Sequence, residues 1–525
     1  MSPRILTLSA FFTLVAGCTL VGPKYEERPV AEILTDATIA EDTRKGALPT
    51  VVEAEMPQID KWWERFNDEA LTRLIAKSFA ANRTLEASRA NLRAAREAWK
   101  YQQGALFPSL DATGGITRNR TSKNGLSGKN TYTDYRIGGD ATWEIDFFGR
   151  TQHLVNAAEA EAEAAEANLQ AAWVSLSAEV ALRYIELRTL QGRLMIAEDT
   201  LGVQEANVKL LVDRSAGGIS TDLERIQAEY DLKTTAAAIP ALKAQIAATE
   251  NVIALLCGVT PGTLPAEIVT PKLPVHETST IDEKGAPQVS ALRMTNIPRP
   301  IRLPMEEGIP ANAISQRPDV VAAERTLKAS VDVLGSAEAE RYPRIFISGS
   351  IGINSLHLGD LVDWDSHFYN FGPGISLPIF HGGQINANIN IKTEQQKAAL
   401  AQYEETVLTA LADIRTALSG YAYEEERLGH LREGVNDAAM AYTIAYNAYT
   451  AGKLRFFEVL DAQRRLFNLD ESRVISEGAM AQAQVNLYKA LCGGWTADQS
   501  DEELAAYFFG ENVSEEPLLA PIETE

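Results

Sequence analysis

The sequence has few cysteines and no long apolar segment beyond its N-terminus. Its 525 residues include three cysteines, at positions 18, 257 and 492, which is too few to predict a disulfide framework. After residue 18 no apolar run reaches the ~18 residues that a transmembrane helix requires. Any membrane-spanning element would therefore be β-structure. The formal net charge of -22 argues against a nucleic-acid partner, and the 45% hydrophobic content allows a sizeable core.

The sequence also lacks the common catalytic signatures. It contains no H-E-x-x-H, no G-x-x-x-x-G-K-[ST], no G-x-S-x-G and no C-x-x-C, and its six histidines are scattered. These absences exclude the metalloprotease, P-loop, α/β-hydrolase and thioredoxin-like classes. The interpretation is a non-enzymatic protein with no metal site and no cofactor.

The N-terminus carries a short export signal. Arg4 is followed by an apolar run that ends in the small residues Ala16 and Gly17 directly before Cys18. This ending resembles a bacterial lipobox, which implies cleavage after residue 17 and a covalent lipid on Cys18. Thr19, in place of an aspartate, favours the outer membrane by the same resemblance. The alternative is an ordinary signal peptide with an incidental cysteine.

The chain is predicted to be an internal duplication. Two halves align at an offset of about 235 residues. Phe107-Pro108 matches Tyr342-Pro343, and Leu256-Cys257-Gly258 matches Leu491-Cys492-Gly493. Seven prolines between residues 261 and 310 predict an extended linker without helix. The predicted organisation is a signal peptide (1–17), an N-terminal segment (18–67), repeat 1 (68–260), the linker (261–310), repeat 2 (311–493) and an acidic tail (494–525).

Each repeat is predicted to contain a very long helix. Apolar residues follow steps of three and four from 149 to 215 and from 382 to 450, a pattern typical of coiled-coil-like helices. About 65 residues at about 1.5 Å each would extend roughly 100 Å. A plain coiled coil would explain these helices, but not the segments that precede them.

The segments 109–147 and 344–380 are predicted β-hairpins with strict alternation. Tyr135, Ile137 and Trp143 fall on one face, and Arg136 and Asp140 fall on the other. One apolar and one polar face suit lipid-exposed barrel strands of ~9–11 residues. Four strands cannot close a barrel, so several copies must contribute, and three copies would supply twelve strands. The alternative is a soluble four-stranded sheet covered by the helices.

Five motifs carry a family resemblance. These are VGPKY (21–25), WEIDFFGR (143–150), RPDV (317–320), LPIFHGG (377–383) and VLDAQR (459–464). With them the chain resembles the TolC-like outer-membrane efflux duct family, in its lipoprotein branch. The resemblance implies an α+β membrane protein: a homotrimer with a twelve-stranded transmembrane β-barrel, continued into a long periplasmic α-helical barrel. The segments 18–67 and 261–310 would form an equatorial belt around the helices.

The same resemblance implies a place and partners. The protein would be lipid-anchored in the outer membrane of a Gram-negative bacterium, among outer-membrane lipid, with a long periplasmic extension. Its partners would be a periplasmic adaptor protein and an inner-membrane efflux pump.

The predicted gate lies at the ends of the long helices, where Gly217, Gly218 and Gly452 mark turns. Phe457 and Asp461 are four residues apart and share a helix face. In a trimer they would form an apolar ring and a ring of carboxylates that attracts cations. By resemblance both match the family's constriction, with Glu458 at another acidic position.

By the same resemblance, Tyr449 and Asp222 match residues that hold the gate shut. Leu454 stands where the family often has a basic residue. Structural alternatives remain open for each position: coiled-coil core for Phe457, a solvated face for Asp461, a helix cap for Asp222 and plain packing for Tyr449.

The predicted function is the outer-membrane channel of a tripartite efflux system that exports small molecules such as drugs and toxic compounds. One alternative is a type I secretion exit duct for polypeptides. Another is a lipid-anchored envelope spacer that does not conduct. The sequence identifies neither the cargo nor the pump, the adaptor or the resting state of the gate.

Overall fold

The computed structural model describes residues 20–36, 51–52, 59–122, 131–217, 220–270, 295–299 and 309–493. The predicted signal peptide, Cys18 and the acidic tail 494–525 lie outside these residues. The chain folds as two compact units. The first takes the described parts of residues 1–29, 89–168 and 319–406, and the second takes those of 30–88, 169–318 and 407–525.

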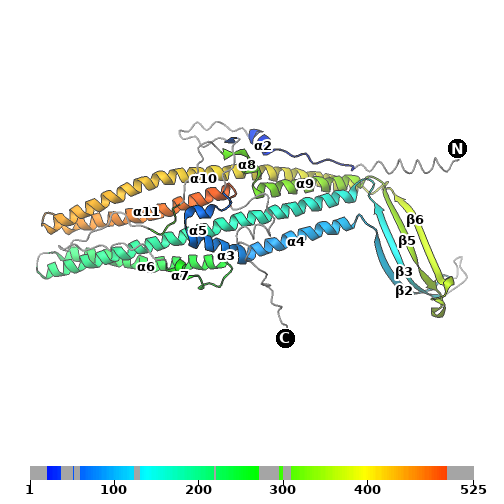
Figure 1. The fold of residues 1–525 in the computed structure, drawn as a ribbon, viewed down its shortest axis with the longest axis horizontal. Helices are drawn as coiled ribbons and strands as arrows, with labels where there is room; N and C mark the ends of the chain where they lie inside the picture. The colour runs from blue at the N-terminus through cyan, green and yellow to red at the C-terminus, as the bar shows by residue number, and fades with distance from the viewer. Residues whose placement is uncertain are drawn as a thin grey trace. The chain divides into compact units, whose positions relative to one another are not determined.

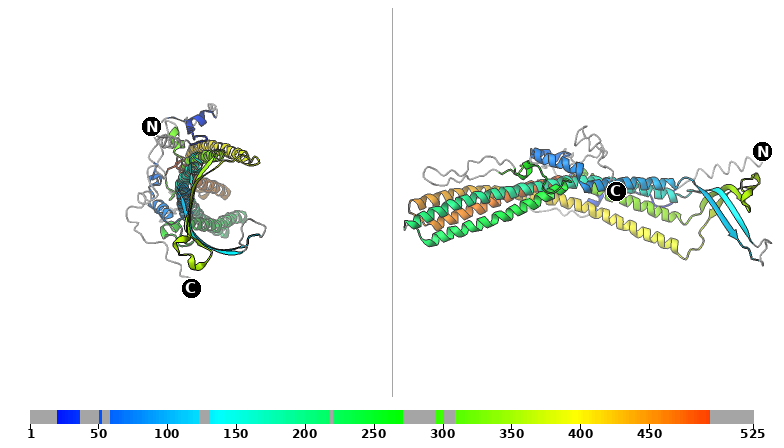
Figure 2. Two further views of the ribbon diagram at one scale, coloured as in Figure 1. Left: turned by 90° about the vertical axis from the view of Figure 1, so that its right-hand side faces the viewer. Right: turned by 90° about the horizontal axis from the view of Figure 1, so that it is seen from below.

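The first unit contains a four-stranded antiparallel sheet. Its strands lie in the order β2 (Ser109–Asn119), β3 (Tyr132–Ile145), β5 (Arg344–Ser355) and β6 (His367–Ser376). β2 pairs with β3 and β5 with β6, as the two predicted hairpins require. β3 also pairs with β5, with Ile137 opposite Ile353, so two hairpins far apart in sequence share one sheet (Figure 1). The sheet is curved, as Figure 2 shows.

The predicted alternation is confirmed, and the register of the strand pairs places the alternating apolar residues of all four strands on the same face. Residues directly opposite each other point to the same side of a sheet, and one such row runs from Gly139 through Ile351 to Tyr369. Six side chains on this face are between 67% and 86% exposed: Leu110, Ile116, Ile351, Tyr369, Phe371 and Ile375. Among the described residues, this apolar face is therefore not covered by the helices of its own unit.

The opposite face of the sheet is polar and internally bonded. Arg136 lies 3.2 Å from the carboxylate of Asp140, which accepts a 2.7 Å hydrogen bond from the Thr113 hydroxyl. The Arg136 guanidinium also lies 4.6 Å from the centre of the Phe368 ring. Arg136 and Asp140 of β3 thus pair with each other and contact side chains of β6 and β2, respectively.

Two strands end earlier than the alternation predicts. β3 ends at Ile145, and β6 ends at Ser376, so Phe147, Leu377 and Ile379 follow the strands. Pro378, which has no N–H to donate to a strand ladder, lies two residues after the end of β6.

The helices occur in two sets of equal length. α4 (Arg83–Gly104) and α9 (Pro318–Ala339) have 22 residues each. The two predicted long helices are confirmed as α5 (Arg150–Ala216) and α10 (Gln384–Thr450), with 67 residues each. α6 (Asp222–Leu256) and α11 (Phe456–Ala490) have 35 each. No helix among the described residues is both long and apolar enough to cross a membrane.

Short elements complete the second unit. They are α2 (Val30–Asp36), η1 (Trp62–Phe66), α3 (Glu69–Ala81), α7 (Ala266–Val269), α8 (Ala311–Ser315) and the two-residue strands β1 (Val51–Val52) and β4 (Ile309–Pro310). η2 (Leu358–Asp360) and η3 (Trp364–Ser366) belong to the first unit, between β5 and β6. The core of the second unit includes the stacked rings of Trp62 and Tyr488, whose centres are 5.1 Å apart.

The expectation that the proline-rich linker contains no helix is wrong at one point. The single turn of α7 fits between Pro265 and Pro271, because prolines exclude a helix only where they interrupt its hydrogen bonds. Arg188 of α5 holds this turn by donating to the carbonyls of Glu267 and Ile268, at 3.2 Å each.

The segment that follows the predicted lipobox is hydrogen-bonded to other parts of the first unit. The N–H of Val21 donates to the carbonyl of Phe148, and the carbonyl of Val21 lies 3.1 Å from Nε2 of the buried His153. Nδ1 of His153 lies 2.8 Å from Asp332 of α9. Tyr25 then donates to Glu324 on the same helix. Residues 21 to 25 are thus held at the junction between sheet and helices.

Candidate functional site

The turn between α10 and α11 holds the predicted gate residues. Gly452 has a φ of +71°, which L side chains rarely adopt. The N–H of Gly452 donates to Tyr449, and the N–H of Lys453 donates to Ala448, each at 2.9 Å. These bonds satisfy carbonyls at the end of α10. α11 then begins at Phe456, so the gate residues occupy its first turns.

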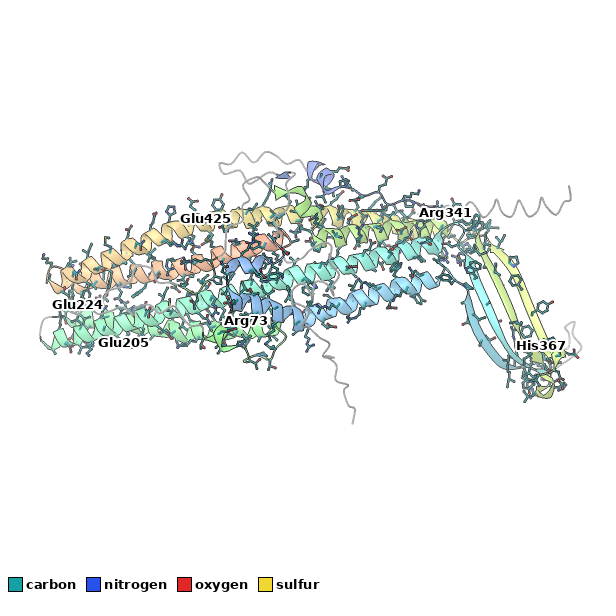
Figure 3. The ribbon with its side chains drawn as sticks, in the orientation of Figure 1. Arg73, Glu205, Glu224, Arg341, His367 and Glu425 are labelled. Atoms are coloured by element: carbon teal, nitrogen blue, oxygen red, sulfur yellow. The ribbon has the colours of Figure 1, made fainter. Side chains whose placement is uncertain are left out.

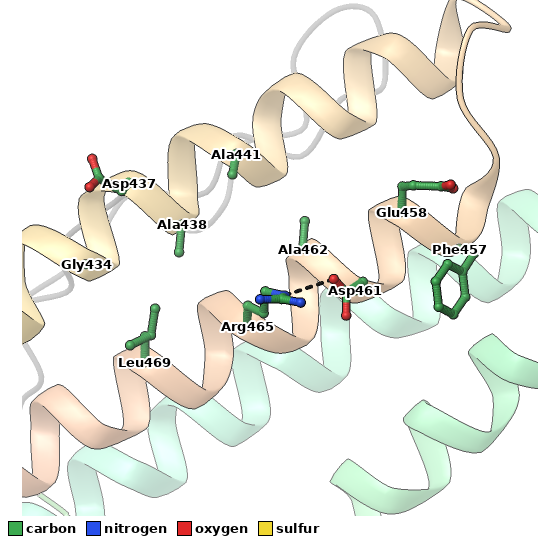
Figure 4. A pocket seen from close by; sticks show the side chains of 10 residues that line it. All are labelled: Gly434, Asp437, Ala438, Ala441, Phe457, Glu458, Asp461, Ala462, Arg465 and Leu469. Atoms are coloured by element: carbon green, nitrogen blue, oxygen red, sulfur yellow. Dashed lines mark hydrogen bonds and ion pairs between the residues drawn. The ribbon is translucent and has the colours of Figure 1, made fainter.

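Phe457, Glu458 and Asp461 lie on a shared groove between α10 and α11. The groove has a volume of about 470 Å³, and small side chains, Ala438, Ala441 and Ala462 among them, line its wall. Figure 4 shows the two helices and the side chains that line the groove. Phe457 is 48% exposed. Within the described part of the chain Phe457 is therefore not an enclosed core residue.

Asp461 carries a neighbouring positive charge that the sequence analysis did not consider. Nε of Arg465 lies 2.9 Å from its carboxylate, one helical turn further along α11 (Figure 4). Both side chains are substantially exposed. A ring built from this position would contain both signs of charge, because each carboxylate brings its own guanidinium.

Glu458 lies on the same turn and approaches Arg455 at 3.9 Å. One of its carboxylate oxygens is buried and has no hydrogen-bond partner among the described residues. A buried carboxylate oxygen without a donor is costly, although the Glu458 side chain as a whole is 38% exposed.

Tyr449 is buried and packs between the two hairpin tips. Its ring meets Phe456 edge-on, with centres 4.9 Å apart, and the Arg214 guanidinium lies 4.6 Å above the ring. Phe456 is fully buried. Arg214 belongs to the last turn of α5, so Tyr449 connects the α10–α11 hairpin to the α5–α6 hairpin. This contact links helices that are far apart in the sequence.

Asp222, the other predicted latch residue, begins α6. Its side chain is 79% exposed and lies 3.6 Å from Arg225 on the same helix. The N-cap of α6 is Thr221, which forms a capping box with Glu224. Leu454 is 41% exposed in the opposite turn. A contact between Asp222 and a second copy of the chain stays a prediction.

α6 and α11 are joined by two carboxylates that the sequence analysis missed. Glu224 accepts a 3.4 Å hydrogen bond from the N–H of Phe456, and Asp231 lies 3.4 Å from Arg464. Burial raises the pKa of Asp231, and Arg464 opposes this shift. The capping-box pattern at Thr221 and Glu224 was readable in the sequence, but the contact between helices was not.

The described residues offer few other metal-binding or reactive groups. Within the described residues no group of three or more histidine, cysteine, aspartate or glutamate side chains is placed to hold a metal. Cys257 is buried, and that burial raises the pKa of its thiol to about 11. The ends of the two helix hairpins therefore carry charged side chains, an aromatic ring and a groove. These features suit the passage of a solute and contact with a partner protein.

Comparison with known proteins supports this interpretation. The model of the outer membrane efflux protein family matches residues 74–259 and 309–493. The toluene efflux pump outer membrane protein TtgC of Pseudomonas putida is 28% identical, over 94% of this chain and 96% of its own length. The probable outer membrane lipoprotein SilC of Salmonella typhimurium is 26% identical, over 94% and 99%.

Among solved structures, the outer-membrane channel OprN is 29% identical, with a TM-score of 0.77 over 90% of this chain and 99% of that one. The family model covers more than half of the sequence in two blocks, and the fold agrees with that of a TolC-like channel. The chain belongs to the outer membrane efflux protein family, and it is an outer membrane protein.

Proposed function

We propose that this chain forms the trimeric outer-membrane duct of a tripartite efflux system for small molecules. The observation that carries the proposal is the sheet. Its apolar face is exposed, and its order ends on β2 and β6. Edge strands cannot remain unpaired in lipid, so neighbouring copies must pair them, and three copies give twelve strands.

The height of the apolar face fits a membrane. From Tyr135 to Ile145 the face extends about 34 Å along β3, at about 3.4 Å per residue. A strand tilt of about 40° reduces this to about 26 Å, close to the ~25 Å apolar band of outer-membrane barrels. The polar face, with Arg136 and Asp140, would then line the lumen.

The helices would continue the duct. α5, α6, α10 and α11 would form a periplasmic α-helical barrel, with segments 18–67 and 261–310 around it. The matching lengths of three helix pairs support an internal duplication as the origin of the two halves. A periplasmic adaptor and an inner-membrane pump would meet the hairpin tips. The passage needs no catalytic group, and the chain acts as a duct rather than an enzyme.

The lipid on Cys18 would enter the membrane close to the sheet. Val21, three residues after Cys18 in the sequence, is bonded to Phe148, which lies three residues after the end of β3. The rings of Phe148 and Tyr342 stack there, with centres 4.9 Å apart. Aromatic side chains favour the membrane–water interface, and this placement agrees with an acyl anchor in the adjacent leaflet.

The names of the relatives support a proposal for the cargo class. TtgC is named for toluene, an apolar small molecule, and this chain would export compounds of that class or other toxic small molecules. The gate would be formed by three copies of Phe457, Glu458 and Asp461, with Tyr449 and Asp222 as its latch. Opening would move the α10–α11 hairpins apart.

Single-channel conductance in planar bilayers tests the proposal, with wild type beside Phe457→Ala/Asp461→Ala. We expect low wild-type conductance that rises clearly in the double variant, because both rings are removed. If neither protein conducts after trimeric insertion is confirmed, the duct is refuted and a spacer is favoured. If both conduct equally, the gate is elsewhere.

A further inference from the structure

The N-terminus of α11 is capped by a residue from another helix. Its own N-cap residue, Arg455, makes no side-chain capping bond. α6, by contrast, begins with a complete capping box, in which one oxygen of Glu224 accepts from the N–H of Thr221. The other oxygen of Glu224 accepts from the N–H of Phe456. One carboxylate therefore serves the first turns of two helices.

This position is electrostatically favourable for a carboxylate. The first N–H groups of a helix have no partner within the helix and carry a partial positive charge. Glu224 lies between the ends of both hairpins, as Figure 3 shows, and so a single negative charge faces two helix N-termini. Moving α11 away from α6 would leave the N–H of Phe456 without this acceptor.

The contacts around Phe456 also hold the start of α11 against the α5–α6 hairpin. Its ring is fully buried against Tyr449, and Tyr449 is in turn covered by Arg214 of α5. The α5–α6 hairpin thus holds the α10–α11 tip at two points, through Glu224 and through Arg214. Phe457, the predicted gate residue, is the next residue after Phe456. The position of its ring therefore depends on where Phe456 is held.

We propose that Glu224 is a positioning residue that holds the gate closed within each protomer, with Arg214 as its companion. The inference rests on the proposed function, because it assigns a role in gating. It differs from the predicted Asp222 latch, since the Asp222 side chain is exposed and paired within its own helix. Opening requires the Glu224 bond to Phe456 to break before Phe457 leaves the pore axis.

Conductance of substituted proteins tests this inference. Glu224→Ala removes both acceptor oxygens. Glu224→Gln keeps one, which serves the capping box of α6 as glutamine commonly does, but it cannot serve both helices. The matched control is Glu229→Gln, on the same helix, where the carboxylate pairs with Arg225 of α6. We expect several-fold higher conductance for Glu224→Ala, an intermediate increase for Glu224→Gln and wild-type conductance for Glu229→Gln.

A second comparison separates gating from a merely structural role. Glu224→Ala is added to the Phe457→Ala/Asp461→Ala protein, in which the gate rings are already removed. A residue that acts by positioning Phe457 should then change the conductance no further. For Glu224→Gln, the far-UV circular dichroism spectrum and the trimer band on gels should match those of the Glu229→Gln control.

The outcomes distinguish this inference from the duct itself. If Phe457→Ala/Asp461→Ala conducts while both Glu224 variants behave as wild type, the duct stands and the role of Glu224 is overturned. The role is also overturned if Glu224→Ala raises the conductance equally with and without the gate rings. If no variant conducts, the proposed function fails first.

Discussion

Replacing the buried Arg473 should destabilise the protein far more than replacing the exposed Arg465, although both pair with carboxylates on α11. Arg473 is 1% exposed and contacts Asp470 at 2.7 Å and Glu477 at 3.0 Å, both of which are 6% exposed. Arg465 is 74% exposed and contacts the carboxylate of Asp461 at 2.9 Å. The two arginines thus differ chiefly in their burial.

The magnitude follows from what each substitution leaves behind. Arg473→Met leaves Asp470 without its cation inside the helix bundle, while Glu477 retains a 2.8 Å hydrogen bond from Thr295. Removing one partner of a buried ion pair costs about 3–5 kcal/mol, because an uncompensated charge stays in a region of low dielectric. An exposed pair contributes about 1 kcal/mol or less, because water screens it. The expected difference between Arg473→Met and Arg465→Met is therefore at least about 2 kcal/mol.

The measurement is urea unfolding of the detergent-solubilised protein, followed by far-UV circular dichroism. A third protein, Asp470→Asn/Arg473→Met, carries no unpaired charge at position 470 and should recover part of the lost stability. The reasoning is refuted if Arg473→Met unfolds at the same urea concentration as Arg465→Met. It is also refuted if the double substitution is less stable than Arg473→Met alone.

Three further predictions concern single residues. Arg465→Gln should increase the preference of the pore for cations over anions, because Asp461 loses its counter-charge; reversal potentials in a salt gradient measure this, and an unchanged ratio contradicts it. The Cys257 thiol, with a pKa of about 11, should be about one-thousandth thiolate at pH 8 and resist alkylation in the native protein, as mass spectrometry would show. Gly452→Ala should cost roughly 1–2 kcal/mol because of its positive φ, whereas Gly420→Ala, in an exposed turn of α10, should stabilise by about 0.5–1 kcal/mol. Thermal melts that shift in the same direction for both glycine variants would contradict the last prediction.

Local patterns were readable because they depend on periodicities of the chain. Steps of three and four residues predicted α5 and α10, and alternation predicted four strands with one apolar face. Gly452 marked the turn before α11, because few other residues adopt its φ. These features depend on neighbours within a few residues, so no knowledge of distant contacts was required.

The charge balance around the predicted gate residues was predicted only in part. The spacing of Phe457 and Asp461 placed them on one face, but the pairing of Asp461 with Arg465 changes the electrostatics of that face. Arg464 is the neighbouring residue in sequence, yet it turns to Asp231 on α6. The i,i+4 spacing of Asp461 and Arg465 on α11 allows their pairing within one helix, whereas the contact of Arg464 with Asp231 depends on how α11 packs against α6.

The sequence alone determined the sets of helices and hairpins, the alternation along the strands and the position of the turns, and it predicts the export signal. Only the tertiary structure decided that β3 pairs with β5, that His153 holds Val21 beside Asp332, and that Glu224 reaches Phe456. Each of these contacts joins residues more than a hundred positions apart. Their partners are selected by packing of whole elements, because a local pattern specifies which face a residue occupies and not what that face meets.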